Sequence, residues 1–306
     1  MTELAGLLRY TRATAIVGDI LKIRAHDVGL GDMALVEMPD GEQSLAQAIQ
    51  LELSKREAFF DDLARSPVRS SAPIDRAVYF RNMARRRSEP GLEPRMLWIL
   101  ATAKANQAER FGVGLAELLG RVNADDPARV HVALQETYHT RMLADVVAMF
   151  GLPVSARPPR AFVRLMIHLM VSAPERWTLP LVGASEMVGC VLFRALRDKG
   201  VELFADEPAV AERIRLLYNE ILADEISRVG FVAARLNEHG RSMMRRLYAR
   251  LSLTLASQFS EIDALFGSAE MARRFSAFHL ADAAAELPTL AFAAVISGPR
   301  LSPDGC

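Results

Sequence analysis

The chain has 306 residues, of which 51% are hydrophobic and 7% aromatic, and its formal net charge is zero. This length allows one large domain or two smaller ones with a substantial core. A neutral chain gives no reason to expect binding to nucleic acid or to an anionic membrane. Its two cysteines, Cys190 and Cys306, do not form the disulfide framework of a small secreted protein. We therefore expect a reducing compartment and predict a cytoplasmic protein.

Neither a signal peptide nor a membrane span is predicted. Charged residues interrupt the apolar positions of the first 20 residues, unlike the layout of a signal peptide. No uncharged apolar run reaches about 18 residues, which is close to the minimum for a transmembrane helix. Residues 1–40 fit either a helix and a loop or a set of short strands.

From residue 43 onward, apolar residues recur with the 3.6-residue period of amphipathic helices, and turns rich in proline, glycine and aspartate separate the periodic segments. Helices are predicted over residues 43–65, 74–87, 94–120, 127–150, 160–173, 178–199, 207–237, 240–266 and 268–280. No alternating strand pattern follows residue 40, so the predicted fold class is all-α. We divide the chain into a helical N-terminal extension (1–93), a four-helix bundle (94–237), and C-terminal helices with a loose tail (238–306).

The four long central helices each carry an acidic side chain on an otherwise apolar face. These acids are Glu109, Glu136, Glu186 and Glu225, and His139 follows Glu136 on the same face. Glu109 and Glu136 lie about equally far from the turn near residue 123, so an antiparallel hairpin places them at the same height. Glu186 and Glu225 are roughly level about a second turn near residue 204. Segment 151–177 then connects the two hairpins as a long crossover, as in ferritin-like four-helix bundles.

Such a cluster of inward acids needs neutralisation. A buried lone carboxylate costs several kcal/mol, and neighbouring carboxylates repel one another. Residues i and i+3 of a helix lie about 5–6 Å apart on one face, so Glu136 could bridge two divalent ions while His139 binds one of them. Carboxylate and imidazole ligands suit iron or manganese better than copper. The pattern therefore predicts a site for two iron ions, or for iron and manganese.

The order Glu, Glu-x-x-His, Glu, Glu-x-x-Arg over residues 94–237 resembles the ferritin-like di-iron carboxylate superfamily, whose pattern ends in Glu-x-x-His. That superfamily includes ribonucleotide reductase small subunits, multicomponent monooxygenases, fatty-acid desaturases and arylamine N-oxygenases. The resemblance implies that Glu109 and Glu186 are terminal ligands. It also implies that Glu136 and Glu225 bridge the metals and that His139 is a terminal imidazole ligand. The implied activity is that of an oxygenase or oxidase, which uses O₂ and an electron donor to hydroxylate or N-oxygenate a small organic substrate.

Arg228 departs from this pattern, because the superfamily has a histidine there. A guanidinium stays protonated and has no lone pair for a metal. We expect Arg228 to pair instead with Glu225, Glu186 or Asp224. Three outcomes stay open, namely a second ion bound by carboxylates and water, one ion only, or an ion network without metal. The last outcome corresponds to an alternative function, a degenerate ferritin-like protein that acts as a binding or structural partner.

The remaining polar residues of these helices are less informative. Tyr218 lies two turns before Glu225 and is a candidate for phenolate ligation or redox chemistry, although a hydroxyl at the edge of the bundle is the simpler interpretation. Glu220 and Asp224 lie off the inward stripe and are expected in solvent. His168 is expected in the core of the crossover helix. If the acids instead lie on outer faces, the chain is a helical protein of another class. The sequence leaves the substrate, the electron donor and the oligomeric state open, a homodimer included.

Overall fold

The structure is a computed structural model, and it describes residues 56–122, 127–154 and 173–279. Throughout these three ranges every regular element is a helix and there is no strand, which confirms the all-α fold class. The predicted helix 160–173, most of the predicted helix 43–65, and the open choice for residues 1–40 lie outside the described residues.

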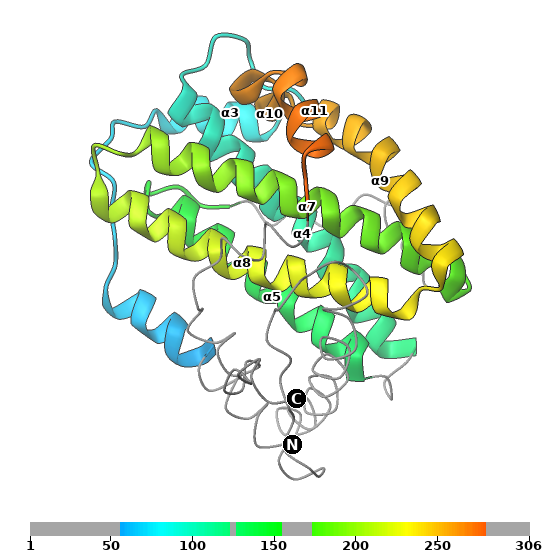
Figure 1. The fold of residues 1–306 in the computed structure, drawn as a ribbon. Helices are drawn as coiled ribbons and strands as arrows, with labels where there is room; N and C mark the ends of the chain where they lie inside the picture. Colours follow the sequence, from blue (N-terminus) through cyan, green and yellow to red (C-terminus); the bar gives the residue numbers. More distant parts are fainter. Residues whose placement is uncertain (1–55, 123–126, 155–172, 280–306) are drawn as a thin grey trace, which may run out of the picture.

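The described chain begins with helical residues 56–65 and continues through the labelled helices of Figure 1. Their bounds are α3 (Arg76–Met83), α4 (Pro94–Val122), α5 (Pro127–Ala148), α7 (Glu175–Leu203), α8 (Pro208–Arg235), α9 (Glu238–Gln258), α10 (Ser260–Phe266) and α11 (Ser268–Ser276). The predicted helix 240–266 is wrong in one respect, because the backbone is extended at Phe259 and divides it into α9 and α10. The predicted start of the helix at 178 is also late, since α7 begins at Glu175 and continues through Pro180.

Local sequence explains most of the helix ends. Pro94, Pro127 and Pro208 begin α4, α5 and α8, where the missing N–H of proline leaves no helical hydrogen bond unmade. The side chain of Asp75 accepts hydrogen bonds from two backbone N–H groups at the start of α3. Between α10 and α11, Gly267 has a φ of 78°, a backbone conformation that residues other than glycine rarely adopt.

The four long helices pack as two hairpins that face each other (Figure 1). Helix α4 lies along α5, helix α7 lies along α8, and the hairpins meet through contacts between α5 and α8 and between α4 and α7. Helix α9 packs along α7, while α3 and α10 pack against α4 at one end of the bundle. This arrangement points one face of each long helix toward a common interior, where the functional side chains lie.

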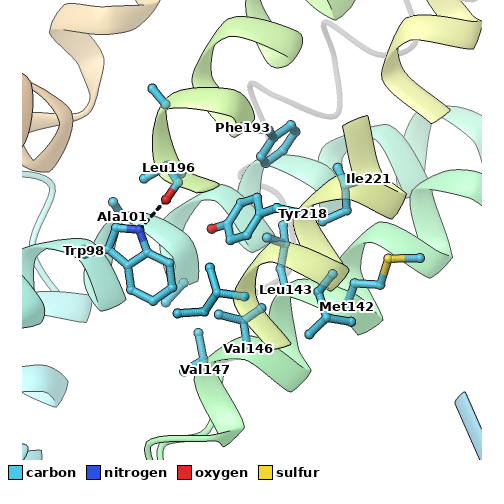
Figure 2. Packing of buried hydrophobic residues seen from close by; sticks show 14 of the residues in the cluster. Trp98, Ala101, Met142, Leu143, Val146, Val147, Phe193, Leu196, Tyr218 and Ile221 are labelled. Atoms are coloured by element: carbon cyan, nitrogen blue, oxygen red, sulfur yellow. Dashed lines mark hydrogen bonds between the residues drawn. The ribbon is translucent and has the colours of Figure 1, made fainter. Parts of the chain in front are cut away.

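The core beside that interior is rich in aromatic residues (Figure 2). Trp98 of α4 is fully buried, and its Nε1–H donates a hydrogen bond of 2.7 Å to the carbonyl of Leu196 in α7. Gly200 of α7 makes room for the indole, because a Cβ there would lie 2.4 Å from the ring. Tyr218 of α8 packs between Trp98 and Phe193, with ring centroids 6.2 Å from each. These contacts fix the α4–α7–α8 arrangement on one side of the polar cluster.

One described helix, α7 over Arg176–Leu203, is long and apolar enough to cross a membrane by length and composition. Half of its most apolar window is buried inside the structure. The central helix of a bundle needs the same composition, because it is surrounded by other helices on several sides.

Candidate metal centre

The five predicted ligands and Arg228 meet in one cluster between the four long helices. The contributions are Glu109 from α4, Glu136 and His139 from α5, Glu186 from α7, and Glu225 and Arg228 from α8. Contacts of His139 with Glu109 and Glu225 join one half of this set. Ion pairs of Arg228 join the other half. The acids therefore do not lie on outer faces, while their role as metal ligands stays a prediction.

His139 lies at the centre of one half of the cluster, with no solvent exposure. Its Nδ1 lies 3.1 Å from Oε2 of Glu109 and 3.4 Å from Oε1 of Glu225. Its Nε2 lies 3.2 Å from Oδ2 of Asp224. The ring therefore has carboxylates on both sides, two at Nδ1 and one at Nε2.

Arg228 lies at the centre of the other half and is 4% exposed. Its Nη1 donates to Glu136 and its Nη2 donates to Glu225. Its Nε lies 3.0 Å from Oε2 of Glu186. Pairing with Glu225 and Glu186 confirms two of the partners that the sequence offered for Arg228. The pair with Glu136 was not predicted. Asp224, the third partner offered, contacts Arg56 and His139 instead.

Asp224 pairs with Arg56, a residue that the sequence did not single out. Two hydrogen bonds, of 3.0 and 2.8 Å, run from the guanidinium of Arg56 to the two carboxylate oxygens of Asp224. The Arg56 side chain is 1% exposed and that of Asp224 is 6% exposed. A bidentate pair of this kind is geometrically specific, so it holds the Asp224 carboxylate in one orientation against His139.

The expectation that Glu220 and Asp224 lie in solvent is wrong, because both residues are buried. The reason is the position of α8, which is enclosed on nearly every side from Leu217 to Ile226. A helix at the centre of a bundle has no solvated face, so the usual division into an apolar and a polar stripe fails there. The run of apolar residues on both sides of this segment is the only signal in the sequence that could have indicated it.

Two helical glycines make room for carboxylates of the cluster. A Cβ at Gly112 of α4 would lie 2.4 Å from Oε2 of Glu136. A Cβ at Gly189 of α7 would lie 2.5 Å from Oε2 of Glu225. Glycine lowers helix stability by about 1 kcal/mol relative to alanine, so its presence at both positions is explained by the space that the carboxylates need.

Two of the acids around Arg228, Glu136 and Glu186, have raised pKa values. Burial raises the pKa of Glu136 to about 8, because the nearby acids add to the effect and Arg228 only partly opposes it. Burial likewise raises the pKa of Glu186 well above its ordinary value, despite Arg228. Burial away from water is the largest cause of both rises, and neighbouring carboxylates add to it. An added cation would lower both pKa values.

Asp224 and His139 show the opposite preference, for the charged forms. Burial acts to raise the pKa of Asp224, but the charges of Arg56 and His139 outweigh it and hold this pKa well below its usual range. Burial acts to lower the pKa of His139, but its hydrogen bonds to carboxylates outweigh burial and raise this pKa. A metal at Nδ1 would replace the proton on that nitrogen and leave the Nε2–H for Asp224.

The described residues fit one metal ion at Glu109, His139 and Glu225. One donor atom from each lies within 4.8 Å of the others. Atoms that bind a common ion at about 2.0–2.2 Å lie up to about 4.4 Å apart, so only a small contraction is needed. The guanidinium of Arg228 contacts Glu136, Glu186 and Glu225, the carboxylates that a second ion would need. The predicted pair of ions stays a prediction.

Tyr218 is not at the edge of the bundle as the simpler interpretation had it. Its side chain is fully buried, and its hydroxyl is 2.8 Å from Oγ1 of Thr102. Burial raises the pKa of this phenol far above its ordinary value, despite the hydrogen bond, so the hydroxyl keeps its proton. The contacts of Tyr218 place it in the aromatic core, and a part in the chemistry of the site stays a prediction. His168 lies outside the described residues.

Comparison of the chain with protein-family models, with curated proteins and with solved structures found no match. The resemblance to the ferritin-like superfamily therefore rests on the pattern of residues and on the arrangement described above.

Proposed function

We propose that the protein is a ferritin-like, metal-dependent oxidoreductase that uses iron or manganese and O₂ to oxidise a small organic substrate. The surroundings of His139 carry the proposal. Glu109 and Glu225 lie beside its Nδ1, and Asp224 lies beside its Nε2. A histidine that binds a metal through one nitrogen commonly donates its other N–H to a carboxylate, which fixes the tautomer and the orientation of the ring.

Arg56 supports this interpretation, because it orients the carboxylate behind the histidine. Its two hydrogen bonds to Asp224 leave Oδ2 of that residue 3.2 Å from Nε2 of His139. Nδ1 then faces Glu109 and Glu225, and its lone pair would become available when a metal displaces the proton from it. Two carboxylates and one imidazole supply oxygen and nitrogen ligands without a thiolate, a set that suits iron or manganese better than soft metals.

Iron or manganese at this position would supply the redox chemistry with O₂, and the chain supplies the surroundings. Glu109, His139 and Glu225 would hold the ion, while Asp224 keeps the proton on Nε2 of His139. His139, Asp224 and Glu225 are buried, which limits the contact of the centre with bulk water to the side of Glu109. Hydroxylation and N-oxygenation both fit such a centre, and either needs an external electron donor.

The test is the metal content of the full-length chain after expression with added iron and manganese. We expect about one ion per chain, and His139→Gln should lower the affinity at least tenfold because it removes a ligand. His239→Gln is a matched control, since His239 is exposed on α9. A folded native chain without metal above background would contradict the proposal.

A second candidate is a protein that binds a partner without metal, and one observation favours it. Arg228 pairs with three carboxylates, and both nitrogens of His139 face carboxylates. Such a network neutralises much of its own charge. Retention of the native melting temperature in a strong chelator, together with absence of bound metal, would support this candidate over the oxidoreductase.

A further inference from the structure

We infer that the guanidinium of Arg228 is a built-in cation that takes the place of a second metal ion in this centre. The inference rests on the proposed metal centre and deepens it, because it assigns different cations to the two halves of the cluster. The half at His139 takes a removable ion, and the other half holds a fixed charge that belongs to the chain.

Two nitrogens of the guanidinium donate hydrogen bonds to carboxylates and the third lies near a carboxylate, and the three carboxylates come from different helices. Nη1 donates to Glu136 of α5, and Nη2 donates to Glu225 of α8. Nε lies 3.0 Å from Oε2 of Glu186 of α7. A second ion would need these same carboxylates as ligands, so the guanidinium occupies the middle of its ligand set.

The fixed cation also adjoins the position of the removable ion. Nη2 of Arg228 lies 3.4 Å from Nδ1 of His139. Oε1 of Glu225 contacts both of these nitrogens, as a carboxylate that bridges two cations would.

The chemistry of the guanidinium sets the consequence. It stays protonated, donates up to five hydrogen bonds and has no lone pair for a metal. Arg228 therefore keeps a positive charge beside Glu136, Glu186 and Glu225 whether or not metal is present, but it exchanges no electrons. The native chain should stop at one ion, and the acids around Arg228 should not need a second ion for folding.

The decisive variant is Arg228→His, which removes the fixed cation and offers an imidazole three residues after Glu225. Arg228→Lys keeps a cation at the position. Arg95→His is the matched control, because it adds a histidine beside Asp206 far along α4 from the cluster. Each full-length, untagged chain is freed of metal, loaded with Mn(II), dialysed and analysed for manganese per chain. We expect one ion in the native chain and in both the lysine and control variants, and two in Arg228→His.

A second measurement uses the native chain and holds even if Arg228→His does not fold. Electron paramagnetic resonance of the Mn(II)-loaded native protein should show the six-line signal of an isolated ion. The spectrum of a spin-coupled manganese pair would overturn the inference. In Arg228→His, the appearance of the coupled spectrum on loading would support it.

The combined outcomes separate this inference from the proposed function. Two ions in the native chain, or one in both the native chain and a folded Arg228→His, would overturn the inference and leave the metal centre standing. No ion in the native chain but metal in Arg228→His would show that Arg228 keeps metal out of the whole centre, which would overturn both the proposed function and the assignment of a removable ion to the half at His139. No ion in either folded chain would overturn both.

Discussion

Asp224 determines how His139 is presented, although it is not itself a proposed metal ligand. Its carboxylate is fixed by two hydrogen bonds from Arg56, and Oδ2 lies against Nε2 of the histidine. Arg56, Asp224 and His139 thus form a buried chain of alternating charge that ends at the proposed ion. Such outer partners usually affect metal affinity almost as strongly as the ligands do.

Asp224→Asn should therefore weaken metal binding about 10–100-fold, because the amide does not supply the negative charge that the Nε2–H and Arg56 face. Competition with a chromophoric chelator measures the affinity. Asp198→Asn is the control, since Asp198 is exposed and pairs with Arg197 outside the cluster. Equal affinity in the Asp224 variant and the native chain would show that the carboxylate does not position the histidine.

Helix α7 combines two demands that conflict in most helices. It must be apolar to pack between α8 and α9, and it must approach α8 closely enough for Glu186 to reach Arg228. Gly189 resolves the conflict beside the site, because the missing Cβ leaves space for the carboxylate of Glu225. Glu225 is itself held by Arg228 and His139, so it has little freedom to move away.

Gly189→Ala should destabilise the protein by about 1–3 kcal/mol, because overpacking against Glu225 outweighs the gain in helix propensity. Metal content should fall with it, since Glu225 is a proposed ligand. Urea denaturation and metal analysis measure the two effects. Ser185→Ala, on an exposed position of the same helix, should change stability by no more than about 0.5 kcal/mol. A Gly189→Ala protein that is more stable than the native chain and keeps its full metal content would contradict the close approach of Gly189 to Glu225.

The C-terminal helices are joined to the bundle by both apolar and ionic contacts. A single cluster of buried apolar side chains extends from Phe59 to Phe278. Within it, Glu261 of α10 is fully buried and pairs with Lys104 of α4, and it also accepts a hydrogen bond from Ser88. Burial acts to raise the pKa of Glu261, but these partners outweigh it and hold the pKa below its ordinary value of 4.5.

The sign of this shift fixes how stability depends on pH. A carboxyl with a lowered pKa in the folded state contributes stability above its unfolded pKa, and the contribution is lost as the pH falls through the folded value. Glu261→Gln should therefore cost about 3 kcal/mol at pH 7 and should flatten the loss of stability below about pH 4.5. Chemical denaturation from pH 7 to pH 3 measures both effects.

Glu202→Gln is the control for that experiment, because Glu202 pairs with Lys199 at the surface and its side chain is 66% exposed. Its effect at pH 7 should stay below about 1 kcal/mol. If Glu261→Gln kept the native dependence on pH, the acid sensitivity would have to come from other carboxylates.

The sequence by itself predicted the long helices and the five candidate ligands that meet between them with Arg228. The 3.6-residue period and the prolines at Pro94, Pro127 and Pro208 locate the long helices, because these signals act within one element. Equal distances from the turns also place Glu109 level with Glu136, since a hairpin fixes heights along its axis. No proline or glycine in the sequence indicates the division between α9 and α10 at Phe259.

Only the tertiary structure decided which partner each charge takes. Arg56 is 168 residues from Asp224 in the chain, and no local pattern links them. The burial of Glu220 and Asp224 depends on how many neighbours surround α8, which is a property of the assembled bundle. The pairing of Arg228 with three carboxylates likewise depends on the meeting of α5, α7 and α8. Periodicity constrains a residue's position around its own helix axis, whereas ion pairs depend on distances between helices that are set by the packing of the whole core.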